Sequence, residues 1–227
     1  MQQLAVVDAH QLGAPANLQQ RVYESLRASL IGGLFAPGES LSLRRIAAAN
    51  GVSPMPVREA VKRLISEGAI ELLPNRTIAV SKLRRRDFIE LTRVREMLEG
   101  HAAELASARL NPQFVLQLAR KNTELIQCVV DHDLAGAMRM NQEFHFDLYR
   151  ASQSLVLVPL IEALWMRMGP VIHVSIGRPE VTWSASHHHA ALQALELRDP
   201  DGVRRAIEWD IRSTAEELLS IDIFALE

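Results

Sequence analysis

Five polar residues lie on the apolar stripes of helices predicted in the second half of this 227-residue chain: Arg95, Asn141, His145, His188 and Asp210. Their helical spacing to apolar neighbours predicts that all five face inward. A buried carboxylate must be paired or bound to a cation. We therefore expect these side chains to converge on one interior site.

The residue types of this cluster suit a cation and an acid. Asn141 and His145 are one helical turn apart, so both can approach one divalent ion, zinc or a similar metal, and His188 and Asp210 complete a mixed nitrogen and oxygen set. Such a set leaves open positions for a carboxylate ligand, which Arg95 can clamp with two hydrogen bonds. A metal-free pocket in which Arg95 and the histidines bind the acid directly is the competing interpretation.

Two further histidines flank His188. His187 and His189 point away from the apolar stripe that His188 shares. We expect both to lie on the surface.

The first half of the chain contains a different pattern, with basic residues on the outside of a helix. A short helix from about Ser42 to Asn50 ends at the Gly51-Val52 turn, and Ser53 then caps a second helix. The inward face of this second helix is apolar, and its outward residues are Arg58, Lys62 and Arg63. This arrangement is typical of a helix-turn-helix.

The flanking segments extend this motif. A helix over Leu18–Ile31 precedes it, and two short strands, Ala69–Leu73 and Thr77–Val80, follow it around a Pro-Asn-Arg turn. The pattern predicts a winged helix; the alternative is a small helical subdomain with solvated charges.

These residues resemble the DNA-binding domain of the GntR family of bacterial transcription regulators. The resemblance is carried by L-x-PGE-x-L at Leu34–Leu41, GVS-x-x-PVREA at Gly51–Ala60 and RL-x-x-EG at Arg63–Gly68. Many relatives have an arginine directly after the Gly-Val-Ser turn, where this chain has Pro54. The family's common operator half-site is therefore not expected here.

The resemblance implies roles for individual residues in binding double-stranded DNA. Arg58 matches a recognition-helix position that reaches bases or phosphates, and Arg44 matches another contacting arginine. Ser53, Asn75 and Arg76 stand at the helix start and the wing tip, where phosphate or minor-groove contacts are expected.

The rest of the chain predicts an all-α bundle of about six helices. They are Asp87–Leu110, Pro112–Val130, Leu134–Ser152, Leu155–Val174, Glu180–Leu197 and Pro200–Ile223. Gly169-Pro170 is expected to kink or split the fourth. The fold class is thus mainly α, an N-terminal winged helix-turn-helix followed by a helical bundle.

This bundle resembles the effector domain of FadR-type GntR regulators. The matching runs are R-x-x-x-E at Arg95–Glu99, F-H-x-x-L-Y at Phe144–Tyr149, and H-x-x-x-L-x-A-L followed by Asp at His188–Asp199. Many members bind a divalent metal through an aspartate and three histidines, beside which organic acids bind.

This chain matches the metal-binding pattern of those members at two of its four positions. His145 and His188 match two of the histidines. Asn141 stands where the family has aspartate, and Asp210 stands where it has the last histidine.

Composition and charge suit a two-domain regulator. The net charge is −2, but residues 1–82 carry +3 and the remainder −5, which fits a DNA-binding head on an acidic body. The single cysteine, Cys128, excludes internal disulfides. The N-terminus lacks a signal-peptide pattern, and no uninterrupted apolar run approaches the ~18 residues of a membrane span. We expect a cytoplasmic protein without a membrane partner.

The expected domains are a flexible tail (1–17), a winged helix (18–81), a linker (82–86) and an effector-binding and dimerisation domain (87–227). The expected function is a homodimeric, ligand-responsive transcription regulator on a palindromic operator, a repressor released by a small organic acid. The alternative is a metal-dependent helical enzyme with an accessory winged helix, but no nucleophile stands beside a base, and no catalytic residue is assigned.

Overall fold

The computed structural model describes residues 17–176, 186–221 and 223–225. The chain divides into two compact units. Unit 1 contains the residues up to Leu83 together with Trp165–His173, and unit 2 contains Arg84–Leu164 and the residues from Val174 onward. The sequence-based domain limits did not anticipate the assignment of Trp165–His173 to unit 1.

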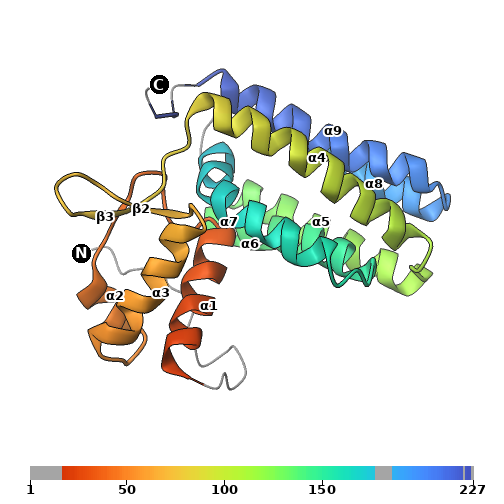
Figure 1. Ribbon diagram of the computed structural model, residues 1–227. Helices are drawn as coiled ribbons and strands as arrows, with labels where there is room; N and C mark the ends of the chain where they lie inside the picture. Colours follow the sequence, from red (N-terminus) through yellow and green to blue (C-terminus); the bar gives the residue numbers. More distant parts are fainter. Residues whose placement is uncertain (1–16, 177–185, 222, 226–227) are drawn as a thin grey trace. The chain divides into compact units, whose positions relative to one another are not determined.

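Unit 1 is a winged helix-turn-helix (Figure 1). Its helices are α1 (Leu18–Ile31), α2 (Leu43–Ala49) and α3 (Pro54–Ser66), and its strands are β1 (Ser40–Leu41), β2 (Ile70–Leu72) and β3 (Ile78–Val80). The expected helices and hairpin are all present. β1 was not expected, because two residues are too few to show the alternation that marks a strand. It pairs antiparallel with β3, which gives the sheet order β1-β3-β2.

Side-chain caps and turns set the helix limits in unit 1. The side chain of Asn17 accepts a hydrogen bond from Gln20 N, and that of Ser42 accepts one from Arg45 N. Gly51 has φ of +62°, a left-handed conformation that a side chain would strain, so glycine suits the turn between α2 and α3. Ser53 occupies the N-cap position of α3, but its side chain makes no capping hydrogen bond.

The core of unit 1 fixes the exposed face of α3. Val57, Ala60 and Leu64 on α3 are fully buried, as are Leu26 and Leu30 on α1. The apolar face was predicted from the same spacing. Because this face packs inward, Arg58 is left exposed to solvent on the opposite side.

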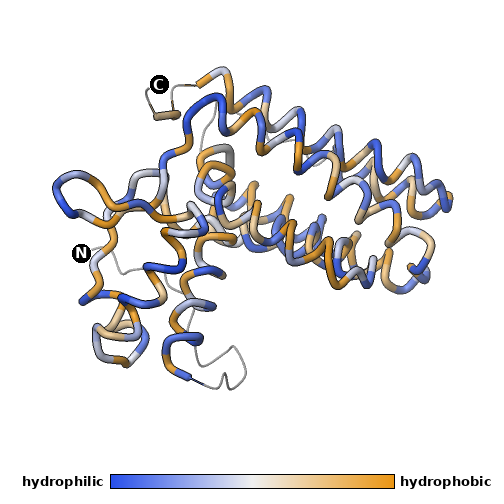
Figure 2. The backbone as a smooth tube through the Cα atoms, in the orientation of Figure 1, coloured by the Kyte–Doolittle hydropathy of each residue, from blue (hydrophilic) through white to orange (hydrophobic). Residues whose placement is uncertain are grey.

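Unit 2 is all-helical in the part that the structure describes. Its helices are α4 (Arg85–Ser107), α5 (Pro112–Val130), α6 (Leu134–Ala151), the first part of α7 (Leu157–Ile176), α8 (Ser186–Glu196) and α9 (Pro200–Leu219). α4 packs along α9, α5 packs along α6, and α8 packs on both α9 and α5. Figure 2 shows apolar and polar residues alternating along these helices, as expected when one face of a helix packs inward.

Two expectations concern α7. Pro170 lies inside one continuous helix, so the Gly169-Pro170 pair does not split it, and a kink at this pair stays a prediction. Its Leu157–Val174 stretch is long and apolar enough that, by length and composition only, α7 could cross a membrane, and 44% of the stretch is buried. The core helix of a globular protein passes the same test, and this stretch includes Glu162 and Arg167.

Asp199 caps α9, the helix that carries Asp210. Its Oδ1 accepts a hydrogen bond from Gly202 N at 2.9 Å. Replacing an N-cap aspartate with alanine costs about 1 kcal/mol. We predict that Asp199→Ala lowers the free energy of unfolding in urea by this amount, whereas Asp199→Asn, which can still cap, changes it little. Equal losses in both variants would contradict the capping role.

Candidate functional site

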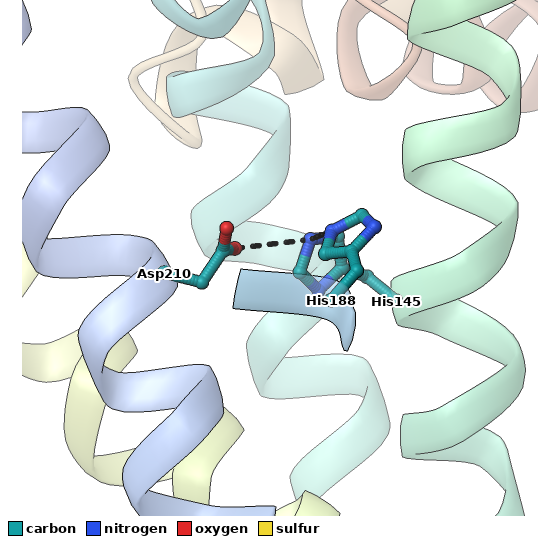
Figure 3. Close-up of side chains that lie close together, drawn as sticks. All are labelled: His145, His188 and Asp210. Carbon is teal, nitrogen blue, oxygen red and sulfur yellow. Dashed lines mark hydrogen bonds and ion pairs between the residues drawn. The ribbon is translucent and has the colours of Figure 1, made fainter. Parts of the chain in front are cut away.

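Three polar side chains from three helices of unit 2 meet in its interior: His145 from α6, His188 from α8 and Asp210 from α9 (Figure 3). All three are buried. Nε2 of His145 lies 3.1 Å from Nε2 of His188 and 3.3 Å from Oδ2 of Asp210. The helical spacing predicted that these residues converge, and the structure brings them together.

Neighbouring hydrogen bonds determine which ring nitrogens face this meeting point. The Tyr149 hydroxyl donates to Oε2 of Glu99 at 2.7 Å, so its oxygen accepts from Nδ1 of His145, 3.0 Å away. Oδ1 of Asn122 lies 3.0 Å from Nδ1 of His188 and accepts a hydrogen bond from it. In the neutral rings, both Nε2 atoms therefore carry lone pairs.

Two lone pairs and a carboxylate that face each other at these distances repel unless a cation lies between them. A proton on Nε2 of His145 is one such cation, and a divalent metal is another. Two ligands of a tetrahedral zinc ion, each about 2.0–2.1 Å from the metal, lie about 3.3 Å apart. The two separations measured from His145, 3.1 and 3.3 Å, match this spacing, and all three ligand atoms lie within 4.8 Å of one another, so the donor set fits a metal ion.

The ionisation of the cluster follows from its burial and its charges. Burial lowers the pKa of His188 to about 3, although the Asp210 charge opposes this shift. Burial alone would raise the pKa of Asp210, but its interactions with His145 and His187 hold it well below its usual value. The cluster therefore contains a carboxylate beside a neutral His188 ring, which suits metal coordination.

Asn141 is buried on α6, one turn before His145. Residues four apart on a helix share a face, so Asn141 and His145 lie on the same face of α6.

His187 is a correction to the sequence analysis, which placed it on the surface. It is only 8% exposed, and its Nδ1 lies 3.5 Å from Oδ1 of Asp210. Its ring also contacts the Trp209 indole edge-on, at 4.1 Å between centroids. His187 thus holds one Asp210 oxygen while His145 faces the other. His189 is exposed, as expected.

Arg95 is buried and paired with Glu99 on the same helix. Its Nε lies 2.6 Å from Oε1 of Glu99, which has no exposed surface. Burial lowers the pKa of Arg95, but the Glu99 charge more than compensates and raises it. Burial and Glu99 together raise the pKa of Tyr149 well above its usual value. Glu99 therefore links Arg95 to Tyr149 and, through it, to His145.

Asn122, Tyr149 and Glu99 were not assigned to the site from the sequence. Asn122 does interrupt an apolar stripe on α5, with buried Val115, Leu118 and Leu125 at helical spacing. The reasoning that selected His145 applies to it as well. The roles of Tyr149 and Glu99 depend on contacts between helices, which spacing alone does not give.

Unit 1 carries the residues expected to contact DNA. Arg44 on α2 and Arg58 on α3 are exposed, as is Ser53 at the start of α3. In the turn between β2 and β3, exposed Asn75 accepts a hydrogen bond from Thr77 N, and exposed Arg76 has φ of +60°.

Two other basic residues of α3 have partners within unit 1. Lys62 pairs with Glu59 at 2.7 Å. Arg63 pairs with Glu67 at 3.0 Å and lies over the Tyr23 ring, 3.7 Å from its centroid. Burial and Glu67 raise the pKa of Tyr23 to about 12. Lys62 thus remains on the solvent side of α3, whereas Arg63 joins α3 to α1.

A winged helix-turn-helix with exposed arginines, together with a helical unit that contains a buried His/Asp cluster, is the arrangement of a DNA-binding transcription regulator with a second, regulatory domain. Comparison with known proteins supports this class. Residues 18–80 match "Bacterial regulatory proteins, gntR family", and residues 90–212 match the FCD domain. The chain belongs to the GntR family and has the FCD-type, FadR-like C-terminal domain.

Several curated proteins and solved structures are similar to this chain. The HTH-type transcriptional regulator McbR of Escherichia coli (strain K12) is 31% identical over 194 residues, 84% of this chain and 88% of McbR. The HTH-type transcriptional repressor RspR of the same strain is 25% identical over 93% of both chains. The structure "E. coli McbR/YncC" superposes with a TM-score of 0.81 at 29% identity, over 91% of this chain and 99% of that one.

These relatives and the family are transcription regulators, so the alternative of a metal-dependent enzyme is not supported.

The Arg95–Glu99 pair generates a prediction about stability. Removing one partner of a buried ion pair leaves an uncompensated charge and costs about 3–5 kcal/mol. We predict this loss for Glu99→Ala, measured by urea unfolding. Glu104→Ala on the same helix is the matched control, because Glu104 is partly exposed and pairs with His101 and Arg204 at 3.4–3.5 Å. If the two variants were equally stable, Glu99 would not carry the proposed charge balance.

Proposed function

We propose that this chain is a homodimeric repressor that binds an imperfect palindrome and is released by a small carboxylate. The buried cluster of His145, His188 and Asp210 carries this proposal, because it offers a cation site inside the unit that corresponds to the family's effector domain. The name of RspR, a transcriptional repressor, favours repression. One helix-turn-helix reads few bases, which favours a dimer on two half-sites.

In this proposal the DNA contacts come from exposed residues of unit 1. Arg58 on α3 reaches bases or phosphate, and Arg44 on α2 adds a second contact. Ser53, Asn75 and Arg76 contact the DNA backbone or the minor groove.

The proposed cofactor is a divalent metal, zinc or a similar ion, held by His145, His188 and Asp210. Asn141 would add a neutral, weaker oxygen ligand. When bound, the metal would supply a positive charge and open coordination positions for an acid. Asn122, Tyr149 and His187 would orient the three main ligands, as neighbouring hydrogen-bond partners do in metal sites.

The proposed effector is a small carboxylate compound that binds at this cation, with Arg95 as its second partner. Because Glu99 already neutralises Arg95, the cation would provide most of the attraction and Arg95 a shared hydrogen bond. An effector can release DNA only if it binds the two conformations of the regulator unequally.

We further infer that residues 18–81 and 87–227 act as the DNA-binding and effector-binding domains, joined by residues 82–86 and preceded by a tail, 1–17. The two units and the two family matches support this division. The proposed location is the cytoplasm, where the DNA of a bacterium lies.

The DNA-binding proposal predicts a strong effect of one exposed arginine. Arg58→Ala should abolish specific binding in a gel shift, because it removes a base or phosphate contact, while effector affinity and the unfolding midpoint stay unchanged. Lys62→Ala is the matched control on the same helix, because Lys62 pairs with Glu59. A normal shift from Arg58→Ala would refute the assignment of α3 as the recognition helix.

The metal proposal predicts that zinc affinity depends on His145 and His188 but not on His189. Chelator-treated protein, titrated with Zn²⁺ against a chromophoric chelator, should bind one ion per chain. His145→Ala or His188→Ala should weaken this binding at least a hundredfold, since each removes a ligand. His189→Ala should leave it unchanged, because His189 is exposed. Equal zinc affinity in all four proteins would contradict the site.

A further inference from the structure

Met55 is a large apolar side chain exposed at the start of α3. Its side chain lies in the first turn of the helix, and the residue is 65% exposed. The apolar residues that follow it, Val57, Ala60 and Val61, are buried. Met55 therefore contributes nothing comparable to the core, and its side chain is accessible at the start of α3.

The same turn lacks polar groups that a recognition helix often offers. Pro54 and Pro56 have no backbone N–H, so two of the four N–H groups that a helix start normally leaves without an intrahelical partner are missing from α3. These missing donors weaken the helix start as a binding site for phosphate. The first turn of α3 thus presents mainly an apolar surface.

In a helix-turn-helix, the N-terminal residues of the second helix contact base edges in the major groove. The apolar group that the major groove offers in unmodified DNA is the C5-methyl of thymine. Methionine is unbranched and polarisable, so its thioether adapts well to such a contact.

We propose that Met55 is a specificity-determining residue that contacts the C5-methyl group of a thymine in each operator half-site. This inference rests on the proposed docking of α3 in the major groove. Arg58 lies one turn further along the same helix, so the apolar contact of Met55 would stand next to the polar contact of Arg58.

The test is a double-mutant cycle in which the thymine methyl group of the DNA and the Met55 side chain of the protein are changed separately and together. An operator is first selected from genomic DNA fragments with the full-length protein. Each thymine of a half-site is then replaced, one at a time, by deoxyuridine, which lacks only the C5-methyl group. For the wild-type protein, we expect one replacement per half-site to weaken binding about three- to tenfold.

The protein variants complete the cycle. Met55→Ala should bind the thymine operator more weakly by a similar factor and should no longer respond to deoxyuridine at that position. Met55→Gln, which keeps the chain length but not the apolar end, should behave in the same way. Met97→Ala is the matched control, because Met97 is a 67% exposed methionine on α4 of the other unit.

Two outcomes would overturn the inference and leave the regulator function intact. One is an operator that wild type binds with no sensitivity to any single deoxyuridine. The other is a Met55→Ala protein whose binding is still weakened by deoxyuridine as much as that of the wild type, whatever its oligomeric state. If no DNA were selected at all, the proposed function itself would fail, and the inference with it.

Discussion

The buried cluster in unit 2 depends on one electrostatic constraint: Nε2 of His145 lies 3.1 Å from Nε2 of His188 and 3.3 Å from Oδ2 of Asp210. Without a cation between them, these groups repel in an environment where water cannot screen them. Several helices contribute to holding this arrangement. α5 supplies Asn122, α4 supplies Glu99, and α6 supplies both His145 and the Tyr149 hydroxyl that fixes its ring.

This arrangement explains why the interior of unit 2 contains so many polar groups. Several buried polar side chains near the cluster have defined partners: Arg95 pairs with Glu99, and His187 holds Asp210. A satisfied buried network is rigid, and a change of charge at its centre alters every hydrogen bond in it. A bound cation and its ligands can therefore bias the packing of the surrounding helices, which is the physical requirement for an effector site.

Much of the fold could be predicted from the sequence because its signals are local. Caps, prolines and glycines mark the helix limits, and apolar spacing marks their buried faces, as at α1, α3 and α5. β1 escaped because its two residues gain their structure from pairing with β3. The convergence of His145, His188 and Asp210 could be expected because each interrupts an apolar stripe.

His187 could not be placed from the sequence for a physical reason. A helix with one buried face cannot bury two consecutive residues equally, so His187 was expected outside. α8 packs on both α9 and α5, and it therefore buries two faces. His187 faces Asp210 of α9, while His188 faces Asn122 of α5. Only the packing of three helices reveals this.

The central claim, that the cluster binds one cation, is tested most directly by X-ray diffraction from crystals grown with zinc, using data collected at the zinc absorption edge. An anomalous peak is predicted about 2.0–2.2 Å from Nε2 of His145, Nε2 of His188 and Oδ2 of Asp210. A map without a peak there, in crystals where the three side chains keep their positions, would contradict the account.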